Sequence, residues 1–210
     1  MDAILAAIAE LKLIPIIVLD DPDDAGPLAD ALLAGGLPCA EVTFRTAAAA
    51  DAIRNFARVP ELTLGAGTVL TIDQAKQAVD AGARFIVTPG FDADVVDYCR
   101  SNGITIAPGV CTPTDVQAAL RHGIRTLKFF PAEAMGGVPV LKALAGPFVD
   151  VTFIPTGGVS ATNLREYLAL PSVVACGGSW MVKKNLIKDG AFDKITTLVR
   201  EAVSIAQSCD

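Results

Sequence analysis

Short apolar runs rich in β-branched residues alternate with alanine-rich amphipathic stretches along almost the whole chain. Parallel strands need a crossover connection, usually a helix, and strands buried on both faces appear as continuous apolar runs. Eight such strand–helix units within 210 residues predict a (β/α)8 TIM barrel of the α/β class. An open doubly wound sheet is the competing architecture, but no Gly-x-Gly-x-x-Gly turn follows the first predicted strand. The strands are predicted at residues 14–19, 39–44, 62–65, 85–88, 105–107, 126–129, 152–155 and 173–176.

A helical pattern at residues 2–11 precedes the first strand, and we expect this extra N-terminal helix to cover the bottom of the barrel. Further helices are predicted at residues 24–34, 47–57, 71–81, 92–101 and 113–121. Asp73 and Thr112 are expected near helix starts, and Gly82, Gly103 and Gly123 just after helix ends. No linker or low-complexity segment interrupts the alternation, so residues 1–210 are predicted to form a single barrel domain.

Composition and charge limit the kinds of partner. Hydrophobic residues make up 52% of the chain and charged residues 19%, and the formal net charge is −6. An acidic chain is a poor partner for nucleic acid or an anionic membrane, but a few local donors are enough to bind a phosphorylated small molecule. No apolar run reaches the roughly 18 residues that a membrane-spanning helix needs. The N-terminus lacks the pattern of a signal peptide.

The cysteines and the single histidine give no sign of a metal site. His122 precedes Gly123 at a predicted helix end, where a C-terminal cap is the simplest interpretation. With one histidine, a histidine-based metal site or a Ser-His triad is not expected. The five cysteines, Cys39, Cys99, Cys111, Cys176 and Cys209, have no paired spacing and suit reduced thiols of a cytoplasmic protein.

Lys128 stands alone among the lysines because it lies inside an apolar run, Thr126-Leu127-Lys128-Phe129-Phe130. Desolvating an ammonium group costs several kcal/mol, so a buried lysine without a partner is expected to be neutral near pH 7 and therefore nucleophilic. The two-residue period of a strand directs Lys128 and Phe130 to the same face. Lys128 is therefore predicted to form a Schiff base. A buried ion pair without chemistry is the alternative.

The second predicted strand carries Glu41, Thr43 and Arg45 at alternating positions. This spacing directs the three polar side chains into the barrel and leaves Ala40, Val42 and Phe44 to meet the helices. Glu41 is expected deepest, across the barrel from Lys128, and Arg45 near the rim. An internal ion pair that only satisfies itself is again the structural alternative.

Two glycine pairs follow the last two predicted strands, Gly157-Gly158 and Gly177-Gly178. The loops after strands seven and eight are a frequent phosphate site in such barrels, because glycines let the backbone approach an anion closely. Plain tight turns would also use glycine.

Smaller signals come from the third, fourth and fifth strands. The segment Gly65-Ala66-Gly67-Thr68 is predicted to leave room for a small ligand while Thr68 donates a hydrogen bond. Thr88-Pro89-Gly90 and Pro108-Gly109 are interpreted first as turns, and lining of the site is a second interpretation.

Taken together, these segments resemble the family of 2-keto-3-deoxy-6-phosphogluconate (KDPG) aldolases, which also act as 4-hydroxy-2-oxoglutarate (KHG) aldolases. The resemblance runs in order along almost the whole chain. The matching segments are Glu41-Val42-Thr43-Phe44-Arg45-Thr46, Gly65-Ala66-Gly67-Thr68-Val69, Thr88-Pro89-Gly90-Phe91, Pro108-Gly109-Val110, Leu127-Lys128-Phe129-Phe130-Pro131-Ala132, Pro155-Thr156-Gly157-Gly158-Val159 and Gly177-Gly178-Ser179-Trp180.

The resemblance implies a class I aldolase in which Lys128 forms the imine and Glu41 is the general acid/base. Arg45 and Thr68 would hold the pyruvate carboxylate. Gly157, Gly158, Gly178 and Ser179 would bind the phosphate, and Pro89 and Phe130 would line the site. The resemblance also implies a homotrimer with a small-molecule substrate and with no metal or cofactor.

Other functions stay open at this point. The closest alternatives are an aldolase for the galactonate epimer or for an unphosphorylated 2-oxo acid. A sugar-phosphate isomerase is disfavoured because no Cys/Asp or Glu/His pair is placed for it. A non-catalytic sugar-phosphate binding barrel would bind pyruvate without turnover. Decarboxylation of oxaloacetate is a side activity that the same imine would support.

Overall fold

The computed structural model describes residues 2–209 and alternates strands with helices from end to end. The helices are α1 Ala3–Leu11, α2 Ala25–Ala34, α3 Ala49–Phe56, α4 Ile72–Asp80, α5 Ala93–Ser101, α6 Pro113–Arg121, α7 Gly137–Ala145, α8 Leu164–Leu168, α9 Lys184–Lys188 and α10 Phe192–Gln207, with the short 3-10 helix η1 at Pro22–Asp24. The strands are β1 Leu13–Ile17, β2 Cys39–Thr43, β3 Thr63–Gly67, β4 Phe85–Val87, β5 Thr105–Ala107, β6 Gly109–Val110, β7 Thr126–Phe129, β8 Thr152–Pro155 and β9 Cys176–Gly178.

All the paired strands are parallel, and they form two sheets. One has the order β5-β4-β3-β2-β1-β9 and the other the order β6-β7-β8. A bridge between Thr156 and Gly177 joins the end of β8 to β9, and one residue, Pro108, separates β5 from β6. Since every strand runs in the same direction, their carboxyl ends meet on one side of the molecule.

The two-residue period of the strands divides the core into an inner and an outer cluster. On β1, Ile14 and Ile16 belong to the inner cluster, whereas Leu13 and Ile17 belong to the outer one. The inner cluster also contains Phe85, Val87, Ala107, Ile154 and Ala175. The strands are thus buried on both faces, which explains why they appear in the sequence as continuous apolar runs.

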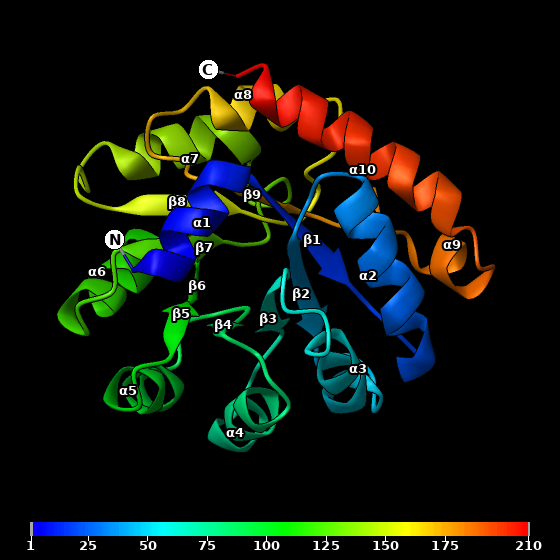
Figure 1. The fold of residues 1–210 in the computed structure, drawn as a ribbon. Coiled ribbons are helices and arrows are strands. Elements are labelled where there is room, and N and C mark those ends of the chain that lie inside the picture. Colours follow the sequence, from blue (N-terminus) through cyan, green and yellow to red (C-terminus); the bar gives the residue numbers. More distant parts are fainter. Residues whose placement is uncertain (1, 210) are drawn as a thin grey trace.

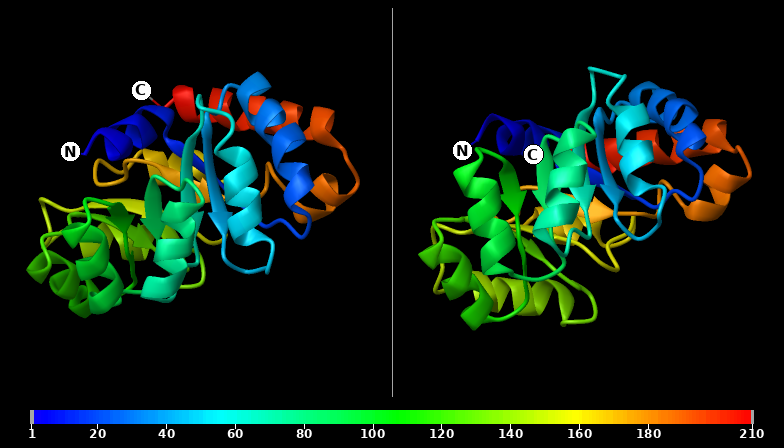
Figure 2. Two further views of the ribbon diagram at one scale, coloured as in Figure 1. Left: turned by 60° about the horizontal axis from the view of Figure 1, so that its bottom comes forward. Right: turned by 90° about the horizontal axis from the view of Figure 1, so that it is seen from below.

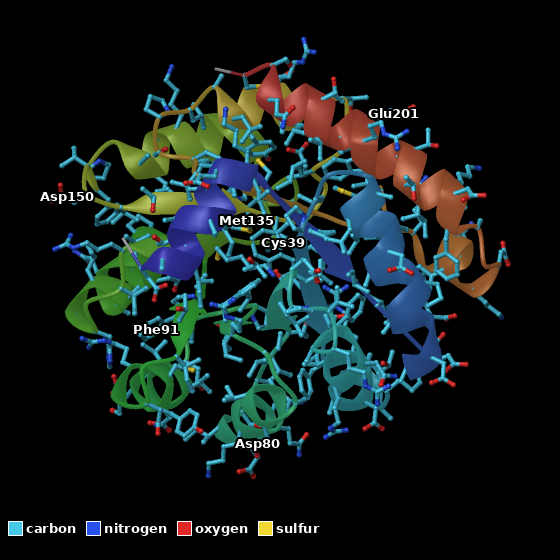
Figure 3. The ribbon with its side chains drawn as sticks, in the orientation of Figure 1. Cys39, Asp80, Phe91, Met135, Asp150 and Glu201 are labelled. Atoms are coloured by element: carbon cyan, nitrogen blue, oxygen red, sulfur yellow. The ribbon has the colours of Figure 1, made fainter. Side chains whose placement is uncertain are left out.

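Helices surround the strands. In Figure 1, α2 to α6 follow one another around the outside of the strands, with α7, α8 and α10 above them. Both views of Figure 2 place α10, in orange to red, beside α2, in blue. Two side chains of α10 fasten this contact: Thr196 Oγ1 donates to the carbonyl of Ala31, and Arg200 donates to that of Ala34. In Figure 3 the labelled residues Asp80, Asp150 and Glu201 lie at the periphery, whereas Cys39 lies near the middle.

Helix α1 packs mainly against the inner cluster, and Leu11 at its end also contacts the outer one. Its residue Ile8 is fully buried in the inner cluster, and Ile4 and Leu11 pack against the same cluster. The side chain of Asp2 caps the helix by accepting a hydrogen bond from the N–H of Ile4, and it also accepts one from the hydroxyl of Thr105. The helix is therefore attached both to the core and to β5.

Helix boundaries follow the predicted capping signals closely. Thr112 and Asp115 form a reciprocal capping box at the start of α6, and His122 is the C-terminal cap that the sequence predicted. Gly82, Gly103 and Gly123 follow helix ends with φ angles of 111°, 66° and 73°. Those angles lie in the left-handed region, which glycine adopts without a Cβ clash.

β1 ends at Ile17, two residues before the predicted Leu19. Three predictions that involve glycines were also wrong in position, two strand boundaries and one turn. β3 continues to Gly67 instead of ending at Gly65, Gly109 lies in a strand instead of a turn, and β9 begins at Cys176 instead of Val173. The glycines explain these three errors, since glycine is depleted in strands and signals a turn. Here they stand in strands because neighbouring groups occupy the space of a side chain: a Cβ on Gly177 would lie 2.3 Å from Thr156 Oγ1.

Candidate active site

A cavity of about 530 Å³ lies where the strands end. Nine of the ten predicted site residues line it: Arg45, Thr68, Pro89, Lys128, Phe130, Gly157, Gly158, Gly178 and Ser179. These residues are spread over the sequence from Arg45 to Ser179, and the fold brings them together. The tenth, Glu41, is not on the cavity wall, but it contacts a residue that is.

Lys128 and Glu41 form a buried pair. The Nζ atom of Lys128 is 3.3 Å from Oε1 of Glu41, and the two residues are 3% and 1% exposed. Leu127 and Phe129, on either side of Lys128, pack in the outer cluster, so strand geometry directs Lys128 inward. The Nζ atom also lies 5.2 Å from the centre of the Phe130 ring. The predicted meeting of this lysine and this carboxylate inside the fold is confirmed.

A glycine makes room for the carboxylate. A Cβ atom on Gly67 would lie 2.0 Å from Oε1 of Glu41, which is far inside van der Waals contact. On the same strand, a Cβ on Gly65 would lie 2.3 Å from the ring of Phe85. The prediction that this segment leaves room for a ligand was therefore wrong, because the protein's own side chains fill the space.

Beneath the pair, Cys39 remains an inert thiol. It is fully buried, and burial, with the Glu41 carboxylate as a smaller cause, raises the pKa of Cys39 far above its ordinary value. Ionising this thiol would place a second negative charge near Glu41. Cys39 is therefore not a nucleophile or a proton donor for this site.

Arg45 and Thr68 lie side by side on the cavity wall. Arg45 Nε donates to Thr68 Oγ1 at 3.3 Å. Thr68 has a φ of 56°, which is an unusual left-handed conformation for a β-branched residue. Such strain persists only where the surroundings enforce it, and it occurs often at functional sites. The guanidinium offers its remaining N–H donors to the cavity, where they fit a carboxylate.

Thr43, the middle residue of the polar series on β2, has a structural task. It is fully buried, and its hydroxyl donates to the carbonyl of Ile17 on β1 at 2.8 Å. This bond fixes the end of β1 to the end of β2. Its inward direction was predicted, but it does not reach the cavity wall.

The loop Gly157-Gly158 offers unpaired backbone donors. Both glycines have positive φ angles, 97° and 85°. Within residues 2–209, no hydrogen bond uses the N–H group of either glycine. Gly157 is half-buried and Gly158 is exposed, and both line the cavity, so an anion bound there would find these N–H groups without a competing acceptor.

The second glycine pair lies inside β9 rather than after it. Gly177 and Gly178 are strand residues, and Ser179 is the first residue beyond them. A Cβ on Gly178 would lie 1.8 Å from the ring of Trp180, which occupies that space. Because β9 ends at Gly178, Ser179 follows directly on a hydrogen-bonded strand and lies on the cavity wall.

Gly177 of the second predicted glycine pair also lies on the wall, and sequence reasoning gave no role to three further wall residues: Ile16, Thr156 and Val159. Thr156 could have been found by its spacing, because Ile154, two residues earlier, faces the inner cluster. Ile16 lies in an apolar run that gives no polar signal.

The described residues contain neither a cluster of metal ligands nor a helix that could span a membrane. Among residues 2–209, no group of three or more His, Cys, Asp and Glu side chains is arranged to hold a metal ion. No helix in that range is long and apolar enough to cross a membrane.

A buried lysine beside a carboxylate, open to a cavity that also holds a guanidinium and free backbone N–H groups, is the arrangement of a lyase that works through a lysine imine. The family model described as "Aldolase: KDPG and KHG aldolase" matches residues 4–198 of the chain. The protein belongs to this family.

Individual relatives are similar over nearly their full lengths. The 2-dehydro-3-deoxy-phosphogluconate aldolase of Haemophilus influenzae is 49% identical over 203 residues, which cover 96% of each chain. The KHG/KDPG aldolase of Escherichia coli K12 is 46% identical over 195 residues, or 92% of each chain. A crystal structure of KDPG aldolase from Legionella pneumophila, with pyruvate captured as a covalent carbinolamine, superposes with a TM-score of 0.91 at 42% identity, covering 95% of this chain and 97% of that one.

Proposed function

We propose that the protein is a class I aldolase that cleaves KDPG to pyruvate and D-glyceraldehyde 3-phosphate, and KHG to pyruvate and glyoxylate. The observation that carries this proposal is the buried contact of 3.3 Å between Lys128 and Glu41 next to a cavity lined by Arg45 and by two pairs of glycines. The names of the relatives and the pyruvate adduct in the Legionella enzyme support the same chemistry.

The first step needs a neutral amine, and Glu41 is placed to accept the proton that Lys128 must lose. In the ion pair the proton is on the amine; moving it to Glu41 leaves a neutral amine and a carboxylic acid with the same total charge. The amine then attacks the C2 ketone and forms a carbinolamine. Loss of water, with protons shuttled by Glu41, gives the protonated imine.

The imine is the electron sink for cleavage of the C3–C4 bond. Glu41, directly or through a water, removes the proton of the C4 hydroxyl group. The electron pair of the C3–C4 bond moves into the imine, which becomes an enamine, and the aldehyde leaves. Glu41 returns a proton to C3, and water hydrolyses the resulting imine to pyruvate and free Lys128.

The other wall residues would orient the substrate. Arg45, with Thr68 beside it, would bind the carboxylate of the pyruvate half. Gly157, Gly158, Gly178 and Ser179 would bind the phosphate through N–H and hydroxyl donors, and Pro89 and Phe130 would line the space between.

The finer architecture is part of the same proposal. Residues 1–210 would form one (β/α)8 barrel domain, with the N-terminal helix α1 across its bottom. The bridge from β8 to β9 and the position of Ile8 in the inner cluster support closure of this kind. A homotrimer and a cytoplasmic location remain predictions that follow from the family resemblance and from the scattered cysteines.

Borohydride trapping tests the function directly. Wild-type protein incubated with pyruvate and borohydride should gain one pyruvate-derived adduct, which peptide mass analysis should locate on Lys128. Lys128→Ala should lose both the adduct and aldol cleavage. Lys194→Ala, which removes an exposed lysine of α10, is the matched control and should behave as wild type. An adduct on any other lysine would refute the assignment.

A further inference from the structure

The loop Thr156-Gly157-Gly158 is fixed from its outer side by three hydrogen bonds to its carbonyl groups. The N–H of Ala132 donates to the carbonyl of Thr156 at 2.8 Å, and the N–H of Glu133 donates to that of Gly157 at 3.0 Å. The side-chain Nδ2 of Asn163 donates to the carbonyl of Gly158 at 3.2 Å. The carbonyls are all occupied, and only the N–H groups of the two glycines remain available beside the cavity.

Glu133 also packs its side chain against this loop. A Cβ on Gly158 would lie 2.4 Å from Cγ of Glu133, so the chain of Glu133 occupies the outer face of that glycine. The carboxylate of Glu133 accepts a hydrogen bond from the hydroxyl of Tyr167 on α8. Tyr167 is fully buried, and it therefore anchors an otherwise exposed glutamate to the core.

The hydroxyl of Tyr167 donates its hydrogen bond independently of pH in the range in which enzymes are assayed. Burial, and then the hydrogen bond to Glu133, raise the pKa of Tyr167 above its ordinary value. The hydroxyl thus stays protonated throughout the pH range in which enzymes are assayed. The bond also holds the negative carboxylate on the outer side of the loop, away from an anion that binds inside.

We propose that Glu133, Tyr167 and Asn163 form an outer clamp that positions the N–H groups of Gly157 and Gly158 for the substrate phosphate, and that this clamp sets the preference for phosphorylated over unphosphorylated substrates. The inference rests on the proposed aldolase function. None of the three side chains lines the cavity, so all three are positioning residues. Their effect depends on a phosphate, because only the phosphate end of the substrate would use the loop.

Tyr167→Phe is the first test, because it removes one hydroxyl and keeps the buried ring. Steady-state kinetics should be measured with KDPG and with KHG, which lacks a phosphate. Loss of one hydrogen bond should raise KM for KDPG about three- to tenfold, with kcat little changed. KM and kcat for KHG should be unchanged. The inhibition constant of inorganic phosphate, competing with KDPG, should rise by the same factor as KM.

Conservative variants and matched controls separate positioning from folding. Glu133→Ala should reproduce the effect of Tyr167→Phe, whereas Glu133→Gln should restore KM, since an amide oxygen also accepts from the Tyr167 hydroxyl. Asn163→Ala tests the third member, the N-cap residue of α8, which bonds the carbonyl of Gly158 directly. Tyr98→Phe and Asn102→Ala are the controls: Asn102 Nδ2 donates to the carbonyl of Tyr98 at 2.8 Å at the end of α5, outside the cavity wall.

Each outcome decides the proposal. An equal rise in KM for KDPG and KHG would mean a general structural role and would overturn it, as would an unchanged KM for KDPG in both Tyr167→Phe and Asn163→Ala. If Tyr167→Phe does not fold, Asn163→Ala decides alone. Failure of the underlying aldolase function is recognised separately, because wild-type protein would then neither trap pyruvate nor cleave KHG.

Discussion

Lys128 on β7 and Glu41 on β2, 87 positions apart in the chain, meet at 3.3 Å inside the fold. Replacing one partner of a buried pair usually costs more than the pair contributes to stability, so such a pair is weak evidence for a stabilising role. Its position at the cavity instead supports the catalytic role that we propose for it. The carboxylate can hold the proton that the amine must lose before it attacks.

Glu41→Gln should separate imine formation from bond cleavage. The amide cannot act as a general acid or base, so kcat for cleavage should fall by roughly 10²- to 10⁴-fold. Lys128 still reaches the cavity in this variant, so borohydride with pyruvate should still label it, although more slowly. Burst kinetics and mass analysis would measure the two steps. Glu61→Gln, an exposed change, is the control; cleavage at the wild-type rate in Glu41→Gln would exclude Glu41 as the acid/base.

Gly67→Ala should displace the Glu41 carboxylate, because the new Cβ would lie 2.0 Å from Oε1. Overpacking of this kind typically costs about 1–3 kcal/mol of stability, and here the displaced carboxylate belongs to the proposed catalytic pair. We expect a large loss of kcat and a lower midpoint of thermal unfolding.

Gly26→Ala is the matched control for that change. Gly26 lies in α2, and no atom is within 4 Å of the Cβ that alanine would add. Alanine favours helix over glycine by up to about 1 kcal/mol, so this variant should be as stable as wild type or more so, with unchanged activity. An active Gly67→Ala enzyme with a wild-type melting midpoint would contradict the role of Gly67.

The strand period was enough to predict that Lys128 and Glu41 face one another, because both lie in strands and side chains alternate between two faces. The role of Gly67 could not be predicted in the same way, since it depends on how β3 is aligned with β2. The register places Gly67 opposite Thr43, two residues beyond Glu41. The residues on either side of Gly67 in the sequence do not indicate how β3 is aligned with β2.

The ends of β3 and β9 were misplaced for a related reason. Glycine disfavours strands when it is considered alone, but Gly177 stands beside Thr156 and Gly178 beside the ring of Trp180. The outer clamp was missed because the glutamate and tyrosine that form it are 34 positions apart. Neither has an unusual neighbourhood in the sequence, whereas Lys128 does.

Arg45→Lys should weaken binding of every substrate that carries the pyruvate half, with or without phosphate. Lysine keeps the charge but loses the flat, two-pronged geometry that matches a carboxylate and the bond of Nε to Thr68 Oγ1. Hydrogen bonds to charged groups contribute about 1.5–3 kcal/mol, so KM should rise roughly ten- to hundredfold if one is lost.

The comparison of substrates makes this prediction specific. KM should rise by similar factors for KDPG and KHG, in contrast to the clamp variants, which should affect KDPG alone. Arg58→Lys, at an exposed position after α3, is the control. A rise in KM confined to KDPG would show that Arg45 binds the phosphate of the substrate and not the carboxylate of its pyruvate half.

Stability at acid pH should depend on the capping box of α6. Burial opposes ionisation of Asp115, but hydrogen bonds from the N–H groups of Cys111 and Thr112 outweigh it and hold the pKa of Asp115 below its ordinary value of 3.8. A carboxyl with a lowered pKa in the folded state stabilises the fold above its unfolded-state pKa, and this contribution is lost as pH falls through the folded-state pKa. The window therefore lies below about pH 4.

Asp115→Asn removes the titration and keeps the shape. Denaturant unfolding of wild type and variant should differ most at neutral pH, and the difference should shrink as the pH falls through that window. Thr112→Ala, which removes the other half of the box, should cost about 0.5–2 kcal/mol. Asp80→Asn, on the exposed end of α4, is the control for losing a charge. A difference between wild type and Asp115→Asn that stays constant down to pH 2 would show that the ionised carboxylate does not stabilise this helix.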